Sequence, residues 1–168
     1  MRMTSTMLFT LMWIGVCMTG CKTEDTMRKV IAARYEAMNK HDVTALAAYY
    51  ADSVRAESSG WNADLIGVKA VCQAYGRYFR SSPDLAYRIT RVLDHGESIV
   101  VEFTSSGTIM NNEPGVPDYM HGKHYQLKNC TIFDFEGGKI VHESTYFDQV
   151  SFLRQVGYFG ANEVARKN

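Results

Sequence analysis

The feature that most constrains the fold is a change of periodicity near residue 85. From there to residue 147, apolar and polar side chains alternate, which is typical of strands that bury one face. Gly96 and the Glu136–Gly137–Gly138 segment interrupt the alternation, and glycine suits tight hairpin turns. The pattern predicts a four-strand antiparallel meander, with a long loop at 111–122 before its third strand. The strands are expected at Leu85–Leu93, Ser98–Thr108, His124–Phe135 and Lys139–Phe147.

Before this change, apolar residues recur at helical spacing, as they do again after residue 148. Helices are expected at Met27–Asn39, after the capping residue Asp42, at Val68–Phe79, and at 149–156 between Asp148 and Gly157. A short extended stretch, Val54–Glu57, lies between the second and third helices. Helices followed by strands predict an α+β fold, with the helices packed over one face of a curved sheet. The chain shows no internal repeat and no linker, so we expect one domain.

Charge excludes several classes of function. The 168 residues include 18 basic and 18 acidic side chains, with formal net charge zero and no basic run. Nucleic acid is therefore not an expected partner, because phosphate binding needs concentrated positive charge.

No Cys/His spacing resembles a zinc site, and we expect neither a metal nor another cofactor. Cys72 lies in a helical pattern and Cys130 in a strand pattern, which favours two separate thiols over a disulfide.

The first 21 residues read as an export signal. Arg2 precedes an uncharged apolar stretch from Met7 to Met18, too short to span a bilayer as a mature helix. The segment ends in Met-Thr-Gly-Cys, which resembles the bacterial lipobox and implies cleavage before Cys21 and lipid on its thiol. A plain secreted protein and a signal anchor are the alternatives. We expect a signal peptide at 1–21, a polar tether at 22–28 and the folded domain at 29–168. Lys22 favours the outer membrane or cell surface over inner-membrane retention.

Short motifs along residues 30–157 resemble the SnoaL-like polyketide cyclase branch of the nuclear transport factor two-like superfamily. Their order and spacing together are more specific than any one of them. The resemblance implies a cone-shaped, cystatin-like half-barrel, with N-terminal helices on its concave face and a pocket between the two layers. It also implies a homodimer formed through the outer sheet face. The motifs are Gly67-Val68-Lys69-Ala70-Val71, Ser82-Pro83-Asp84-Leu85, Ser106-Gly107-Thr108, Gly115-Val116-Pro117, Gly122-Lys123, Gly138-Lys139-Ile140-Val141 and Asp148 with Leu153-Arg154-Gln155-Val156-Gly157.

Asp148 has two alternative roles, one implied by the resemblance and one by its position before a predicted helix. In the cyclases of this branch, the aspartate before the final helix is a cofactor-free general acid/base, whereas its position here equally suits a helix cap. His124 is a second catalytic candidate, since a histidine at a pocket edge can shuttle a proton. The sequence departs from the family at Ile109, where the family has histidine, and at Ser144, where it often has tryptophan. Ser58 takes the place of a ketosteroid-isomerase-like base, which disfavours that activity.

Aromatic residues are the main candidates for lining the pocket, and each is equally a candidate for ordinary core packing. His121 is added as a pocket-edge residue, with a solvated loop histidine as its alternative. Glu102 is expected on the outer face of the sheet, although a place in the cavity is the alternative. The aromatic candidates are Tyr50, Trp61, Phe79, Phe103 and Tyr146.

Two functions remain open at this stage. One is a cofactor-free cyclase, isomerase or lyase acting on a small apolar carbonyl compound. The other is a non-catalytic module that binds a small apolar or aromatic ligand or dimerises. A lipid anchor, as the only membrane attachment, favours the second, because polyketide assembly is cytoplasmic.

Overall fold

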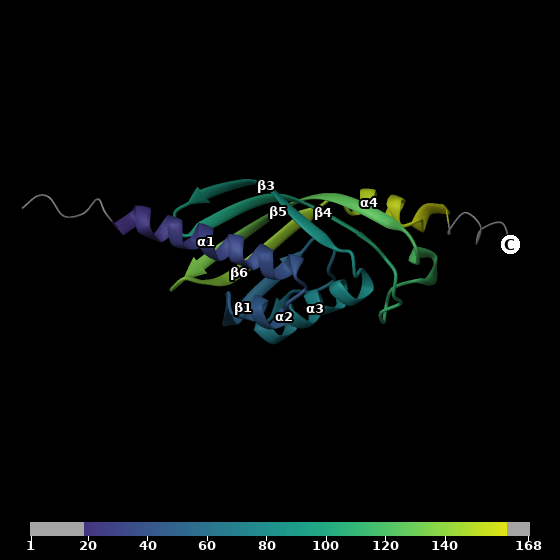
Figure 1. Cartoon of the computed structure of the whole chain (residues 1–168), viewed down its shortest axis with the longest axis horizontal. Coiled ribbons are helices and arrows are strands. Elements are labelled where there is room, and N and C mark those ends of the chain that lie inside the picture. Colours follow the sequence, from purple (N-terminus) through teal and green to yellow (C-terminus); the bar gives the residue numbers. More distant parts are fainter. Residues whose placement is uncertain (1–18, 161–168) are drawn as a thin grey trace, which may run out of the picture.

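The computed structural model describes residues 19–160 as helices packed against the concave face of one curved sheet (Figure 1). Among the side chains that the structure describes, at residues 25–160, the buried core runs from Met27 to Val156, so a chain that begins at residue 22 includes it. The elements are α1 (Thr19–Asn39), α2 (Val43–Ala47), β1 (Tyr50–Ser58), β2 (Leu65–Ile66), α3 (Val68–Ser81), β3 (Ala86–His95), β4 (Ser98–Thr108), the 3-10 turn Asp118–Met120, β5 (His124–Glu136), β6 (Lys139–Phe147) and α4 (Gln149–Gln155).

The sheet confirms the predicted α+β fold and its meander. Its strand order is β2-β1-β6-β5-β4-β3, and every neighbouring pair is antiparallel except β1 with β6. The β1–β6 pairing joins the start of the domain to its last strand. It turns the predicted four-strand meander into a six-strand sheet.

Side chains on the sheet divide by parity into a concave and an outer face. On β4, Val101 and Phe103 are buried and face the helices, while Glu102 between them is exposed on the outer face, as expected. On β6 the register with β5 shifts, because Asp134 opposes His142 and Phe135 opposes Ile140. Val141 is therefore an extra residue in the strand, and the bulge brings both Ile140 and Glu143 to the buried face.

Helix α1 packs an apolar stripe, with Met27, Ile31 and Met38 almost fully buried. It begins at Thr19, so residues 22–28, predicted as a tether, continue the helix, and Met27 belongs to the core. Cys21 lies in the first turn of this helix, and residues 1–18 of the predicted signal lie outside the described residues. Within residues 19–160, no helix is both long and apolar enough to cross a membrane.

Local capping signals predict the two short helices well. The Asp42 carboxylate accepts a hydrogen bond from the Ala45 amide at 2.9 Å, and the Asp148 carboxylate accepts one from the Ser151 amide at 2.9 Å. Gly157 follows α4 with φ +85°, the left-handed conformation that glycine adopts most easily. Cys72 and Cys130 are free thiols, as expected.

Candidate functional site

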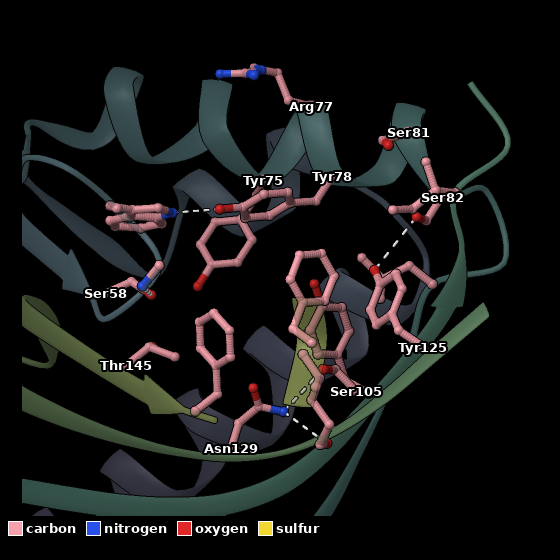
Figure 2. Close-up of a pocket in the computed structure, with 18 of the residues that line it drawn as sticks. Ser58, Tyr75, Arg77, Tyr78, Ser81, Ser82, Ser105, Tyr125, Asn129 and Thr145 are labelled. Atoms are coloured by element: carbon pink, nitrogen blue, oxygen red, sulfur yellow. Dashed lines mark hydrogen bonds between the residues drawn. The ribbon is translucent and has the colours of Figure 1, made fainter. Parts of the chain in front are cut away.

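A cavity of about 400 Å³ lies between the concave face of the sheet and the helices. Figure 2 shows Tyr75 and Tyr78 reaching into it from α3, while Asn129 and Thr145 face them from β5 and β6. Arg77 points away from the space, and its guanidinium donates to the Pro114 carbonyl at 2.6 Å. The 111–122 loop and α4 complete the wall.

Nine aromatic side chains line the cavity. They come from α1, the loop after β1, α3, the four strands β3 to β6, and α4, and many are held by ring-to-ring contacts. Phe103 lies 6.1 Å from Tyr87 between ring centroids, and Tyr125 meets Phe152 edge to face at 5.4 Å. The Trp61 indole N–H donates to the Tyr78 hydroxyl, which fixes the indole against the wall (Figure 2). Such a wall favours flat or ring-shaped apolar molecules.

Besides the charged side chains of Arg34, Arg77 and Glu113, the polar groups of the wall are mainly hydroxyls and the amides of Asn129 and Gln149. The Thr131 and Thr145 hydroxyls bond each other at 2.8 Å, and the Tyr125 hydroxyl reaches Ser82 at 3.5 Å. The Asn129 amide nitrogen donates to the Ser105 hydroxyl at 3.0 Å (Figure 2). These groups are neutral, and they can orient a ligand without contributing net charge.

A buried ion pair adjoins the cavity. One guanidinium nitrogen of Arg34 lies 3.0 Å from each carboxylate oxygen of Glu143, and both side chains are almost fully buried. The Arg34 guanidinium also donates to the hydroxyls of Tyr50 and Tyr75, both at 2.8 Å. Those two hydroxyls in turn donate to Glu143, the Tyr50 bond being 2.5 Å long. We call these four residues the Arg34–Glu143 network.

Burial and the paired charges explain the protonation of this network. Burial acts to lower the pKa of the Arg34 guanidinium, but the Glu143 carboxylate beside it raises that pKa well above its ordinary value. Burial raises the pKa of Tyr75 well above its ordinary value, and the Glu143 charge adds to the effect. The phenols of Tyr50 and Tyr75 therefore stay neutral beside the Arg34–Glu143 ion pair. The positive charge of Arg34 is already balanced and is not free to hold an anionic ligand.

Carboxylates are scarce in the wall. Glu113 is the one carboxylate among the described residues that line the cavity, and it pairs with Arg80 through two bonds of 2.9 Å. Glu143 lies behind Arg34 and Tyr75. Residues 19–160 hold no cluster of three or more His, Cys, Asp or Glu side chains able to bind a metal ion.

Two of the predicted aromatic residues, Trp61 and Phe103, line the cavity. Tyr50 belongs to the Arg34–Glu143 network instead. Phe79 is a core residue stacked on the His41 ring at 4.5 Å, because α3 turns this side chain towards α2. Tyr146 lies outside the cavity wall, since it is 51% exposed on the outer face while its neighbours Thr145 and Phe147 point inward.

The predicted catalytic and histidine residues lie outside the cavity wall. Asp148 is exposed and caps α4. His124 is exposed at the start of β5, where its ring nitrogen lies 3.2 Å from the Thr108 hydroxyl. His121 is exposed in the loop before β5. The structure does not bring these three side chains together with the aromatic wall.

Sequence reasoning missed the ion pair. Arg34 offered a signal, because it falls within the apolar stripe of α1, three residues after Ile31 and four before Met38. A buried charge is unfavourable unless a second group compensates it, so a charged residue at such a position predicts a buried partner. Glu143 had no such signal in the sequence, because its side chain points inward only as a result of the bulge at Val141.

Comparison with known proteins gives the family. Residues 31–143 match the SnoaL-like domain, so the chain belongs to the SnoaL-like domain family. No curated protein sequence matches the chain.

Solved structures share the fold at low sequence identity. TsrD from Streptomyces laurentii is 20% identical, with a TM-score of 0.69 over 79% of this chain and 96% of that one. A putative SnoaL-like polyketide cyclase from Jannaschia is 15% identical, with a TM-score of 0.70 over 79% of this chain and 92% of that one. TerC, co-crystallised with polyporic acid, is 14% identical, with a TM-score of 0.64 over 78% and 98%. These likenesses establish the nuclear transport factor two-like fold.

Proposed function

We propose that this domain binds a small, largely apolar ring compound in the cavity between its sheet and its helices. The observation that carries the proposal is a cavity of about 400 Å³ lined by nine aromatic side chains. Of its charged residues, Arg34 and Glu113 are ion-paired and Arg77 donates to the Pro114 carbonyl. Small-molecule sites commonly have this volume and this mixture of apolar wall and sparse polar contacts. The co-crystallisation of TerC with polyporic acid supports small-molecule binding on the same fold.

Binding is better supported than acid/base catalysis. A proton carrier must come within hydrogen-bond reach of the reacting atoms. The Asp148 carboxylate is exposed and bonded to the Ser151 amide, and Glu143 is fully engaged by Arg34, Tyr50 and Tyr75. A cofactor-free cyclase or isomerase that uses Asp148 would need this carboxylate to leave its cap and enter the cavity.

Trp61 offers a direct assay of binding. It is the only tryptophan of residues 22–168, so that chain gives a single indole N–H signal in a proton–nitrogen NMR spectrum. Because the indole lines the cavity, titration with 2-naphthol should shift this signal saturably. A titration without a shift, or one that does not saturate, would contradict the proposal.

Two variants of adjacent residues supply the matched control. Ser105→Phe places a ring in the cavity from β4 and should abolish the saturable shift. Thr104→Phe places the same ring on the outer face of the same strand and should leave the shift unchanged. If both variants lost the saturable shift of the Trp61 signal equally, the loss would reflect disturbed folding and not the filling of the cavity.

We also propose that the mature protein is anchored in the membrane by lipid on Cys21, at the outer membrane or the cell surface. The support is the Met-Thr-Gly-Cys sequence after an apolar stretch. Cells fed a labelled fatty acid should incorporate the label into the wild-type protein and not into Cys21→Ser. Equal labelling of both would exclude Cys21 as the lipid site.

Homodimer formation through the outer sheet face is a second proposal. Leu93, Val100 and Ile132 stand opposite one another on β3, β4 and β5 and form an apolar row on that face, beside the exposed Tyr146. Ile132→Lys should convert a dimer into a monomer in sedimentation velocity. A wild-type chain that sediments as a monomer at high concentration would refute this proposal.

A further inference from the structure

One polar pair stands apart within the aromatic wall. Asn129 and Ser105 lie on neighbouring strands, β5 and β4, and each side chain is at least nine-tenths buried. Both line the cavity, and Figure 2 shows the amide oxygen of Asn129 pointing into the open space. We call these two residues the Asn129–Ser105 pair.

Hydrogen bonds determine which way the Asn129 amide faces. Its nitrogen donates to the Leu127 carbonyl at 3.1 Å as well as to the Ser105 hydroxyl at 3.0 Å. A carbonyl can only accept, so the atom that faces Leu127 must be the amide nitrogen. Both amide protons are then used, and the side-chain oxygen is the group left facing the cavity.

This oxygen has no partner of its own. It accepts no hydrogen bond within residues 19–160, yet it is not among the fully occluded unpaired atoms, which are the Tyr35 hydroxyl and one Asp94 oxygen. The Ser105 hydroxyl accepts from Asn129, and its own proton is not committed within the same residues. The pair therefore presents one free acceptor and one free donor side by side.

The surroundings define what can occupy this position. A carboxylate would face the Asn129 oxygen, and the nearby guanidinium of Arg34 is already balanced by Glu143. A pure hydrocarbon would cover the Asn129 oxygen without satisfying it, and a buried unsatisfied acceptor is unfavourable. A neutral hydroxyl satisfies both members, because it donates to Asn129 and accepts from Ser105.

From this geometry we infer that the Asn129–Ser105 pair selects ligands that carry an uncharged hydroxyl group on a ring. The inference rests on the proposed function and adds specificity to it: the aromatic wall holds the ring, and the pair recognises the hydroxyl.

Three probes of one ring system test this selection through the Trp61 indole signal. Wild-type residues 22–168 should bind 2-naphthol about tenfold more tightly than 2-methoxynaphthalene, which lacks the donor; tenfold corresponds to about 1.4 kcal/mol. The anionic 2-naphthoate should bind more weakly than 2-naphthol by a similar factor or more.

Variants then assign the preference to the pair. Asn129→Leu should reduce the 2-naphthol to 2-methoxynaphthalene affinity ratio from about ten to near one, and Ser105→Ala should reduce it in part. Thr104→Val is the control, because Thr104 precedes Ser105 on β4 and lies on the outer face of the sheet, away from the cavity. The ratio should not change in that variant. Because the readout is a ratio, a general loss of affinity in a less stable variant does not imitate the result.

The possible failures differ from one another. If 2-methoxynaphthalene or 2-naphthoate binds wild type as tightly as 2-naphthol does, the selection by the pair is refuted while the binding function stands. Retention of the full preference by Asn129→Leu also refutes it. If none of the three probes binds, the proposed function itself fails.

Discussion

Substitution of Glu143 by glutamine tests the Arg34–Glu143 network directly. Glutamine has nearly the same shape and keeps one carbonyl acceptor, so the change removes the negative charge and replaces the second accepting oxygen by an NH2 donor. Arg34 remains protonated in proteins, and it is 1% exposed. Its charge would then lose its counterion without gaining contact with water.

The size of the effect follows from this burial. Removing one partner of a buried ion pair costs about 3–5 kcal/mol. Tyr50 and Tyr75 donate to different oxygens of Glu143, so one of the two hydroxyls can still donate to the glutamine carbonyl. We therefore take the lower end of this range and expect a loss of about 3 kcal/mol. A typical domain is stable by about 5–15 kcal/mol, and the variant should therefore still fold. The melting temperature should fall by roughly 6–12 °C.

Urea unfolding of residues 22–168, followed by circular dichroism, measures this loss. The midpoint should fall in Glu143→Gln while the slope stays the same, which indicates a change of stability without a change of the unfolded state. Glu36→Gln is the control, because Glu36 pairs with Lys40 on the exposed side of α1 and should have no measurable effect. Equal midpoints for the two variants would refute the burial argument.

Three further predictions concern single positions. Asp148→Ala should lose about 1 kcal/mol of stability because it removes the helix cap, whereas Asp148→Asn keeps the cap and should not. Neither variant should change the affinity for 2-naphthol. Weaker 2-naphthol binding in both variants would show that Asp148 takes part in the binding site. Gly157→Ala should lose about 1 kcal/mol in urea unfolding, because its φ is +85°, and an unchanged midpoint would contradict that conformation. Burial acts to raise the pKa of Asp84, but hydrogen bonds from the Thr108 amide and hydroxyl overcome it and hold the pKa below its ordinary value. The stabilisation is present above the unfolded-state pKa of about 3.9 and is lost as pH falls through the folded-state value. The stability gap between wild type and Asp84→Asn should therefore narrow below about pH 4, and a constant gap would refute it.

Local signals predicted most of the secondary structure. The caps Asp42 and Asp148 and the glycine at 157 act on backbone within a few residues of themselves, and the structure confirms all three. The alternation also located β4 and β6 with their observed bounds. The parallel β1–β6 pairing was not predictable in this way, because it joins segments about ninety residues apart and leaves no local pattern.

The site was predicted less completely, for a physical reason. Alternation shows that a strand has two faces but does not say which face meets the cavity when both carry apolar groups. On β6 the bulge at Val141 resets the parity, so Thr145 and Phe147 point inward and Tyr146 points outward. Phe103, on the regular strand β4, faces the cavity.

We propose above that a ring compound occupies the cavity. Isotope-filtered NOE spectroscopy of labelled residues 22–168 with unlabelled 2-naphthol tests it most directly, because the effect reports which protons lie beside the ligand. We expect contacts from 2-naphthol to Phe103, Leu127 and Phe152, which line the cavity from β4, β5 and α4. Contacts to the outer-face residues Ile132 and Tyr146, with none to the cavity residues, would contradict it.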